Sequence, residues 1–124
     1  VQRNHLNQDL TRYERRRVWV LDSNLKPGTT HQYKRRTYYI DEDTWTILAV
    51  DIYDGRDQLW RVQEYHPVMV PWLKAVGPAL ATVYDLNANR YLVMEASNEE
   101  PLFEERDWDV DHFTTGSVQR MATR

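Results

Sequence analysis

The chain has 124 residues, contains no Cys and carries a formal net charge of −3 at pH 7, with 28% charged residues. This length suits a single domain, and the absence of Cys excludes disulfides, thiolate metal sites and cysteine nucleophiles. No apolar run approaches the roughly 20 residues that a membrane-spanning helix needs.

Basic residues gather in the first 36 positions, which hold nine Lys or Arg against three acidic residues. The clusters Arg15–Arg17 and Lys34–Arg36 are of a kind found in nucleic-acid-binding domains, but such domains are usually basic overall and this one is mildly acidic. We therefore predict no nucleic-acid partner. These cations are expected to pair with acids on neighbouring strands.

The residue pattern predicts an antiparallel meander. Runs rich in aromatic and β-branched residues are typical of strands, and the Pro, Gly, Asn and Asp residues between them are typical of turns. The predicted strands span residues 13–25, 32–40, 45–53, 59–66, 79–85 and 90–96. Pro27 and Gly28 suit a type II turn, because Pro presets φ and Gly accepts a positive φ.

The remaining segments predict little regular structure. Pro67, Pro71 and Pro78 indicate an irregular crossing, and the acidic tract Glu99–Asp111 indicates a surface loop. Thr114 or Thr115 could cap one short helix that runs towards Ala122. The predicted fold class is mainly β, with four to six antiparallel strands and one short C-terminal helix.

The simplest turn registers predict which side chains share a face of the sheet. The predicted cross-strand pairs are Trp19 with Arg36, Arg17 with Tyr38, Ile40 with Trp45, Tyr38 with Ile47, Ala49 with Val62 and Asp51 with Trp60. One face is then rich in aromatic residues, and the other is more aliphatic. One short helix cannot cover both, so we expect the cover to come from the rest of a longer protein, a second copy of the chain or an apolar ligand.

If the cover is a hydrophobic ligand, the exposed apolar residues of one face would bind it. The candidates on the aromatic face are Trp19, Tyr38, Ile40, Trp45, Ile47 and Trp60. If the opposite face is the concave one, they are replaced by Val18, Val20, Tyr39, Leu48, Val50 and Leu59.

Metal and cofactor sites are not indicated. Asp107–Asp111 has the alternating acids of the first half of a calcium loop, but His112 takes the place of the required Gly and Val118 that of the final Glu. The four His residues lack paired ligand spacing. We predict no metal and no cofactor.

Catalysis is not indicated either. Asp51, Glu64 and His66 are the only raw material for a hydrolase, and Arg neighbours in the predicted register would hold the two carboxylates ionised. There is no nucleophile elbow and no phosphate-binding Gly loop. We predict that the chain is not an enzyme.

The chain resembles a bacterial family of unknown function that is usually labelled outer membrane lipoprotein-sorting protein. The resemblance is strongest from Arg12 to Glu64 and is weak from Pro67 to Ala81. It rests on these segments: Arg12-Tyr13-Glu14, Arg17-Val18-Trp19-Val20, Leu25-Lys26-Pro27-Gly28, Tyr39 to Trp45, Asp51 to Arg56, Leu59-Trp60-Arg61-Val62, Val83 to Leu86, Arg90-Tyr91, Asn98-Glu99-Glu100-Pro101 and Phe113-Thr114.

The resemblance implies a longer periplasmic protein, of which this chain is a single C-terminal domain, with a signal sequence expected in the removed N-terminal part. It implies a curved open half-barrel, related to Lol-type lipoprotein carriers, with helices over its concave side. The implied function is non-enzymatic binding or transport of lipids, lipoprotein acyl chains or other hydrophobic molecules. The alternative is an interaction module that docks an exporter or an outer-membrane barrel, and dimerisation of the fragment is a further way to cover its faces.

Overall fold

The structure, a computed structural model, describes residues 2–96 and 106–122. Within them, six strands form one antiparallel sheet in the order β1-β2-β3-β4-β5-β6. The strands are β1 Val18–Asn24, β2 Arg35–Asp41, β3 Ile47–Tyr53, β4 Leu59–Val70, β5 Ala75–Asp85 and β6 Arg90–Met94. A short 3-10 helix, η2 (Val110–Phe113), precedes the α-helix α1 (Thr115–Ala122). The prediction of a mainly β fold with one short C-terminal α-helix is confirmed.

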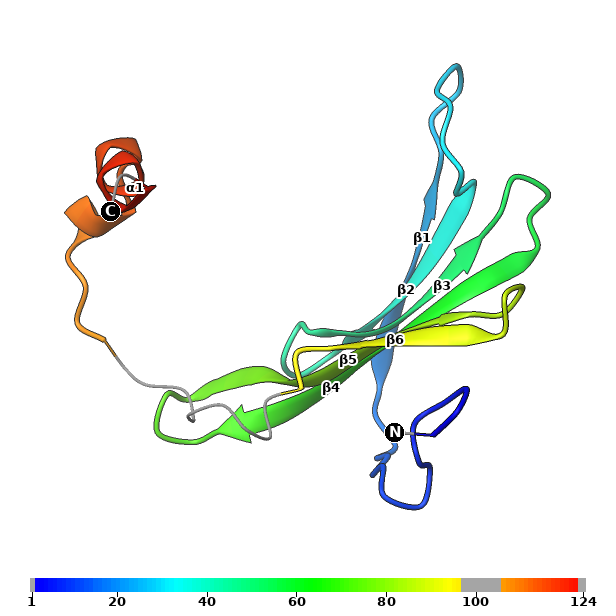
Figure 1. Cartoon of the computed structure of the whole chain (residues 1–124), viewed down its shortest axis with the longest axis horizontal. Helices are drawn as coiled ribbons and strands as arrows, with labels where there is room; N and C mark the ends of the chain where they lie inside the picture. Colours follow the sequence, from blue (N-terminus) through cyan, green and yellow to red (C-terminus); the bar gives the residue numbers. More distant parts are fainter. Residues whose placement is uncertain (1, 97–105, 123–124) are drawn as a thin grey trace.

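The sheet is strongly curved (Figure 1). The N-terminal residues lie on its convex side, and α1 stands apart from it on the concave side. Among the elements of the described residues, α1 contacts η2 and none of the strands. Residues 2–96 and 106–122 therefore leave the concave surface without a covering helix or strand.

The register between β2 and β3 differs from the prediction. Tyr38 lies opposite Val50 instead of Ile47. The connecting turn contains Trp45 in a left-handed backbone with φ of 57° and is two residues longer than predicted, because Ile40 lies opposite Ile47 instead of Trp45. Leu48 is then the extra residue of a β-bulge opposite Tyr39 and Ile40, and it makes the total offset odd. Since side chains alternate with a period of two, this odd offset brings the predicted aliphatic residues of β3 onto the face of Tyr38.

The other two predicted registers are also wrong, but by even numbers of residues. Trp19 lies opposite Ile40 instead of Arg36, and Asp51 lies opposite Val62 instead of Trp60. An even shift slides a strand along its neighbour without turning its side chains to the other face. The grouping of residues within each of these two strand pairs is therefore unchanged.

Two rows of cross-strand neighbours define the faces. The row on the concave face is Leu21, Tyr38, Val50, Gln63, Val83 and Leu92. The row on the convex face is Val20, Tyr39, Ala49, Glu64, Thr82 and Val93. Each row crosses all six strands.

The predicted irregular crossing after His66 is wrong. β4 continues to Val70 and β5 begins at Ala75, so the two longest strands form one hairpin. Pro67 lies opposite Pro78, next to a bulge that follows His66. Prolines are tolerated in sheets at bulges, where the ladder is already interrupted and a missing N–H removes no hydrogen bond.

Two further boundaries differ from the prediction. β1 begins at Val18 instead of Tyr13, because the preceding residues turn onto the convex face, where the Arg17 carbonyl accepts a last backbone hydrogen bond from the Glu42 N–H at 3.2 Å. η2 falls at the end of the segment predicted as an acidic loop. The part of that tract between residues 99 and 105, and the segment 98–101 that carries part of the family resemblance, lie outside the described residues.

The N-terminal segment, residues 2–17, covers the convex face over β4, β5 and β6. Leu6 is buried at 6% exposure, and the Tyr13 ring meets the His66 ring edge-on at 5.8 Å. Arg16 is paired with Asp41 at 3.0 Å, and the Tyr91 hydroxyl donates a hydrogen bond to the Gln2 carbonyl at 2.8 Å. The chain thus supplies its own cover on one side of the sheet.

Candidate functional site on the concave face

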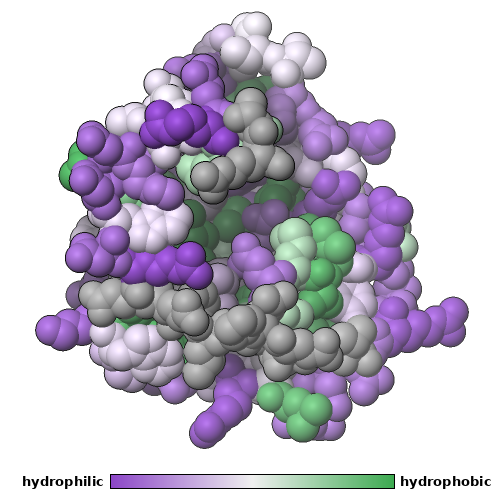
Figure 2. Space-filling view, turned by 60° about the vertical axis from the view of Figure 1, so that its left-hand side comes forward, coloured by the Kyte–Doolittle hydropathy of each residue, from purple (hydrophilic) through white to green (hydrophobic). Residues whose placement is uncertain are grey.

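A groove of about 440 Å³ lies on the concave face. Its wall is formed by β3, β4, β5, the end of β6 and the turn before β3. The lining residues are Trp45, Thr46, Ile47, Leu48, Ala49, Val50, Gln63, Glu64, Tyr65, Ala81, Thr82, Val83, Met94 and Glu95. The space-filling view onto this side of the molecule shows a recess with hydrophobic residues in its depth (Figure 2).

The apolar residues of the groove range from buried to half-exposed. Val50 is 6% exposed, whereas Ile47 is 44% and Met94 is 41% exposed. On the same face, Leu21 and Leu92 are each 54% exposed. Several exposed large apolar side chains on one face of a sheet indicate a site for a ligand or a partner.

The structure brings together five of the six predicted site residues. Trp45 and Ile47 line the groove. Ile40 lies opposite Ile47, and Trp19 opposite Ile40, which continues the apolar surface towards β1. The rings of Trp19 and Trp45 stack with centroids 6.5 Å apart. Tyr38 lies beside Val50 on the same face.

Trp60 lies elsewhere. It is the extra residue of a bulge between β3 and β4, and its indole N–H donates a hydrogen bond to Oδ1 of Asp85 at 3.1 Å. Its ring packs edge-on against Tyr33. Trp60 therefore belongs to the polar end of the sheet.

The alternative set of predicted residues is divided between the two faces. Leu48 and Val50 line the groove, together with residues of the first set. Val20 and Tyr39 belong to the convex face, as does Val18, which lies opposite Asp41. Leu59 lies opposite Tyr53 at the edge of the β3–β4 turn.

Sequence reasoning missed the β4–β6 side of the groove. Tyr65, Ala81, Val83 and Met94 line it, and no predicted register extended beyond β4. Val83 and Asp85 are two residues apart, as are Arg90 and Leu92, so each pair lies on one face of its strand. This period of two is the signal that could have placed these residues on the same surface.

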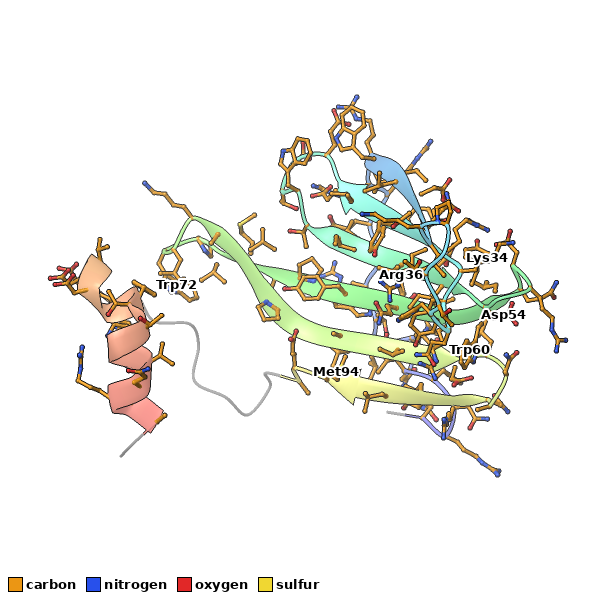
Figure 3. All side chains as sticks on the ribbon, turned by 90° about the horizontal axis from the view of Figure 1, so that it is seen from above. Lys34, Arg36, Asp54, Trp60, Trp72 and Met94 are labelled. Atoms are coloured by element: carbon orange, nitrogen blue, oxygen red, sulfur yellow. The ribbon has the colours of Figure 1, made fainter. Side chains whose placement is uncertain are left out.

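One end of the concave face is charged. The cross-strand row next to the Tyr38–Val50 row is Ser23, Arg36, Ile52, Arg61, Asp85 and Arg90. This row holds three guanidinium groups and one carboxylate. Figure 3 shows Arg36, Lys34 and Trp60 gathered at this end, with Met94 near the opposite end of β6.

Asp85 is the centre of this charged end. Its side chain accepts hydrogen bonds from Trp60, from Arg61 at 3.2 Å and from the Ala88 N–H at 3.0 Å. Burial alone would raise the pKa of Asp85, but the hydrogen bonds from Ala88, Trp60 and Arg61 outweigh it and lower the pKa. Asp85 is therefore ionised at neutral pH and neutralises Arg61.

A titratable cluster lies under the N-terminal segment on the convex face. Nε2 of His66 is 3.8 Å from Oε2 of Glu64, and burial raises the pKa of both Tyr13 and Tyr84, with the Glu64 charge adding to the rise. Asp51 does not join this pair, because its carboxylate accepts a hydrogen bond from the Tyr39 hydroxyl at 2.8 Å. The N-terminal segment lies between the cluster and solvent.

The described residues contain no group of three or more His, Asp or Glu side chains arranged to hold a metal ion. No helix in the described part of the chain is long and apolar enough to cross a membrane.

Residues 1–119 match the family described as "Protein of unknown function (DUF1329)", so the chain belongs to that family. An uncharacterized protein of Pseudomonas aeruginosa, PA3922, is 50% identical over 105 residues, which are 81% of this chain and 22% of that protein. The chain therefore spans about a fifth of the length of this relative.

Two crystal structures share the fold. A DUF1329 family protein from Desulfovibrio piger has a TM-score of 0.50 and 19% identity, over 61% of this chain and 31% of that one. A domain from Vibrio parahaemolyticus described as a putative outer membrane lipoprotein-sorting protein has a TM-score of 0.50 and 14% identity, over 61% of this chain and 32% of that one.

Proposed function

We propose that this chain forms part of the wall of a non-enzymatic binding site for acyl chains of lipids or lipoproteins, or for other hydrophobic molecules, in a protein of the bacterial envelope. The observation that carries the proposal is the unequal cover of the two faces. Residues 2–17 cover the convex face over β4, β5 and β6, whereas the concave face keeps an apolar groove of about 440 Å³.

The groove has the form that such a ligand requires. The apolar residues of the groove come from four strands. The affinity for a ligand would therefore come mainly from burial of apolar surface, at roughly 25 cal/mol per Å². The likeness to a lipoprotein-sorting domain supports a lipid-related role, and also a periplasmic location, through the shared fold.

A pair of substitutions on opposite faces tests the proposal. Ile47→Glu places a carboxylate at the groove, where Ile47 is 44% exposed; Val20→Glu places the same group on the convex face, where Val20 is 61% exposed. In native mass spectrometry of the full-length protein, we expect co-purified lipid in the wild type and in Val20→Glu. Ile47→Glu should lose most of it, because an acyl chain cannot solvate a carboxylate.

Lipid-free wild-type protein that also ignores added lipid would contradict the proposal. So would equal loss of lipid from both variants.

A second candidate function is a docking site for a protein partner. The observation that favours it is the stacked pair Trp19 and Trp45, which are 54% and 72% exposed at the β1 side of the sheet. Exposed Trp residues are frequent anchors of protein interfaces. A photocrosslinking residue at position 45 separates the two functions, since a docking site gives one dominant protein adduct and a lipid site gives a lipid adduct.

A further inference from the structure

A second hollow, of about 380 Å³, lies at the charged end of the concave face, where β1 and β2 join. It is lined by Ser23, Asn24, Leu25, Lys26, Thr29, Thr30, His31, Tyr33, Lys34, Arg35 and Arg36. Four of these residues are cations and none is acidic. We call this the cationic hollow.

Two of the four cations are already neutralised. Arg35 pairs with Asp57 at 3.1 Å and with Asp22 at 3.5 Å, and Lys34 lies 3.8 Å from Asp57. These pairs hold the walls of the hollow together. They leave the other two cations, Lys26 and Arg36, to determine its charge.

Arg36 and Lys26 form no ion pair with a carboxylate in the part of the chain that the structure describes. The Arg36 guanidinium lies over the Tyr33 ring at 5.1 Å from its centroid. The Tyr33 ring is fixed in turn by its hydroxyl contact with Arg61 and by its edge-on packing against Trp60, 5.6 Å between centroids. Arg36 is thus positioned by an aromatic ring and keeps its hydrogen-bond donors available.

The cationic hollow and the apolar groove belong to one surface. Arg36 lies opposite Ile52, and Ile52 is two residues along β3 from Val50 on the groove floor. Two residues of strand span about 7 Å, and neighbouring strands lie about 5 Å apart. On β6, the Met94 end of the groove is four residues, or about 14 Å, from the charged row at Arg90.

We propose that the ligand of this surface is a lipid with an anionic phosphate head group, whose acyl chains lie along Val50, Val83 and Met94 and whose phosphate is bound by Arg36 and Lys26. This inference rests on the proposed function and adds the class and the orientation of the ligand. Charge complementarity is the argument for it, because a guanidinium binds phosphate oxygens through paired, charge-assisted hydrogen bonds.

The test compares two soluble lipids that share the same chains. Dihexanoylphosphatidylglycerol carries the anionic head, dihexanoylglycerol lacks it, and glycerol 3-phosphate supplies the head alone. Binding of each to the full-length protein is measured by calorimetry. We expect the phosphatidylglycerol to bind about tenfold more tightly than the diacylglycerol, which is the usual size of one charge-assisted contact.

Arg36→Gln should reduce this difference severalfold, and Arg36→Gln with Lys26→Gln should abolish it, while the affinity for the diacylglycerol, which has no phosphate, stays the same. The matched control is Arg56→Gln, which removes the same charge from the exposed β3–β4 turn. This control should keep both affinities. Glycerol 3-phosphate should bind at least tenfold more weakly than the phosphatidylglycerol, since it leaves the groove empty.

The outcomes separate this inference from the function on which it rests. If both lipids bind equally, or if Arg36→Gln weakens them equally, the head-group site is wrong and the apolar groove stands. If glycerol 3-phosphate binds as tightly as the phosphatidylglycerol, the hollow is an anion site unrelated to lipid. If neither lipid binds to the protein, the proposed function fails as well.

Discussion

Asp41 joins three parts of the chain at the end of β2. Its carboxylate accepts two hydrogen bonds from Arg16 of the N-terminal segment, at 3.1 and 3.0 Å, and one from the Thr44 hydroxyl in the following turn at 2.7 Å. The same Arg16 reaches Asp43 at 2.9 Å. The turn that follows β2 is thus tied, through Asp41, to the N-terminal segment.

These contacts predict a pH dependence. The Arg16 guanidinium, and then the Thr44 hydroxyl, lower the pKa of Asp41 from 3.8 to about 2. Because the folded pKa lies below the unfolded one, the ionised carboxylate stabilises the fold fully above pH 4, and this contribution disappears as the pH falls to 2. We expect Arg16→Gln to raise the pKa of Asp41 towards 3.8 and to lower the stability of the protein at neutral pH.

The measurement is an NMR titration of the Asp41 carboxyl together with urea unfolding at pH 7 and pH 3. The stability difference between wild type and Arg16→Gln should shrink at the lower pH. Arg15→Gln is the control, since Arg15 is exposed and this substitution removes an equal charge one residue away from Arg16. An unchanged Asp41 pKa in Arg16→Gln, or an equal shift in Arg15→Gln, would show that the ion pair does not form.

At the scale of the element, the N-terminal segment, residues 2–17, packs across the convex face without forming a strand. We call this segment the strap. Leu6 is 6% exposed, and Thr82 on the convex face of β5 is 1% exposed. Leu10, four residues later, is 80% exposed. Only part of the strap is packed, and that part stabilises the convex face.

We therefore expect Leu6→Ala to lower the free energy of unfolding by about 2 kcal/mol, the low end of the cost of truncating a buried Leu. Leu10→Ala, the matched control, should change it by less than about 0.5 kcal/mol, as exposed substitutions usually do. Urea unfolding gives both values. Hydrogen exchange should also quicken at β5 in Leu6→Ala; equal effects of the two substitutions would refute the packed strap.

The strands were predictable because alternation and turn residues are local signals, whereas the registers depended on details that sequence does not show. A residue with an ordinary side chain, Trp45, adopts φ of 57°, and this lengthens one turn. Pro67 and Pro78 face each other at a bulge within a hairpin that the prolines had argued against. In both places, pairing with the neighbouring strand outweighs the usual conformational preference of a single residue.

The candidate site was partly predictable for the same reason. The apolar residues of β1 to β3 were named, since their aromatic and β-branched pattern is visible in the sequence. The groove itself mixes both predicted sets, because the bulge at Leu48 makes the offset odd and turns Val50 to the face of Tyr38. Arg36 and Tyr33 acquire a role only once the hairpin brings them beside Trp60 and Arg61.

At the scale of the whole molecule, the chain covers about a fifth of the length of its relative from Pseudomonas aeruginosa. Among the described residues, β1 and β6 each have one neighbour in the sheet, and no described element packs on the concave face. A concave face that exposes Leu21 and Leu92 at 54% each suits a larger assembly, in which further structure or a ligand completes the site.

This openness predicts how the chain behaves when it is produced alone. We expect the 124-residue chain to keep a β-type circular dichroism spectrum, to bind a hydrophobic dye and to self-associate in light scattering, because the concave face then meets water. Leu21→Lys with Leu92→Lys should reduce both dye binding and association, since Lys disfavours edge and face contacts. The full-length protein should bind less dye per molecule. A folded monomeric chain that binds no dye would mean that the concave face is already satisfied by its own side chains, and the case for a ligand groove would lose its physical basis.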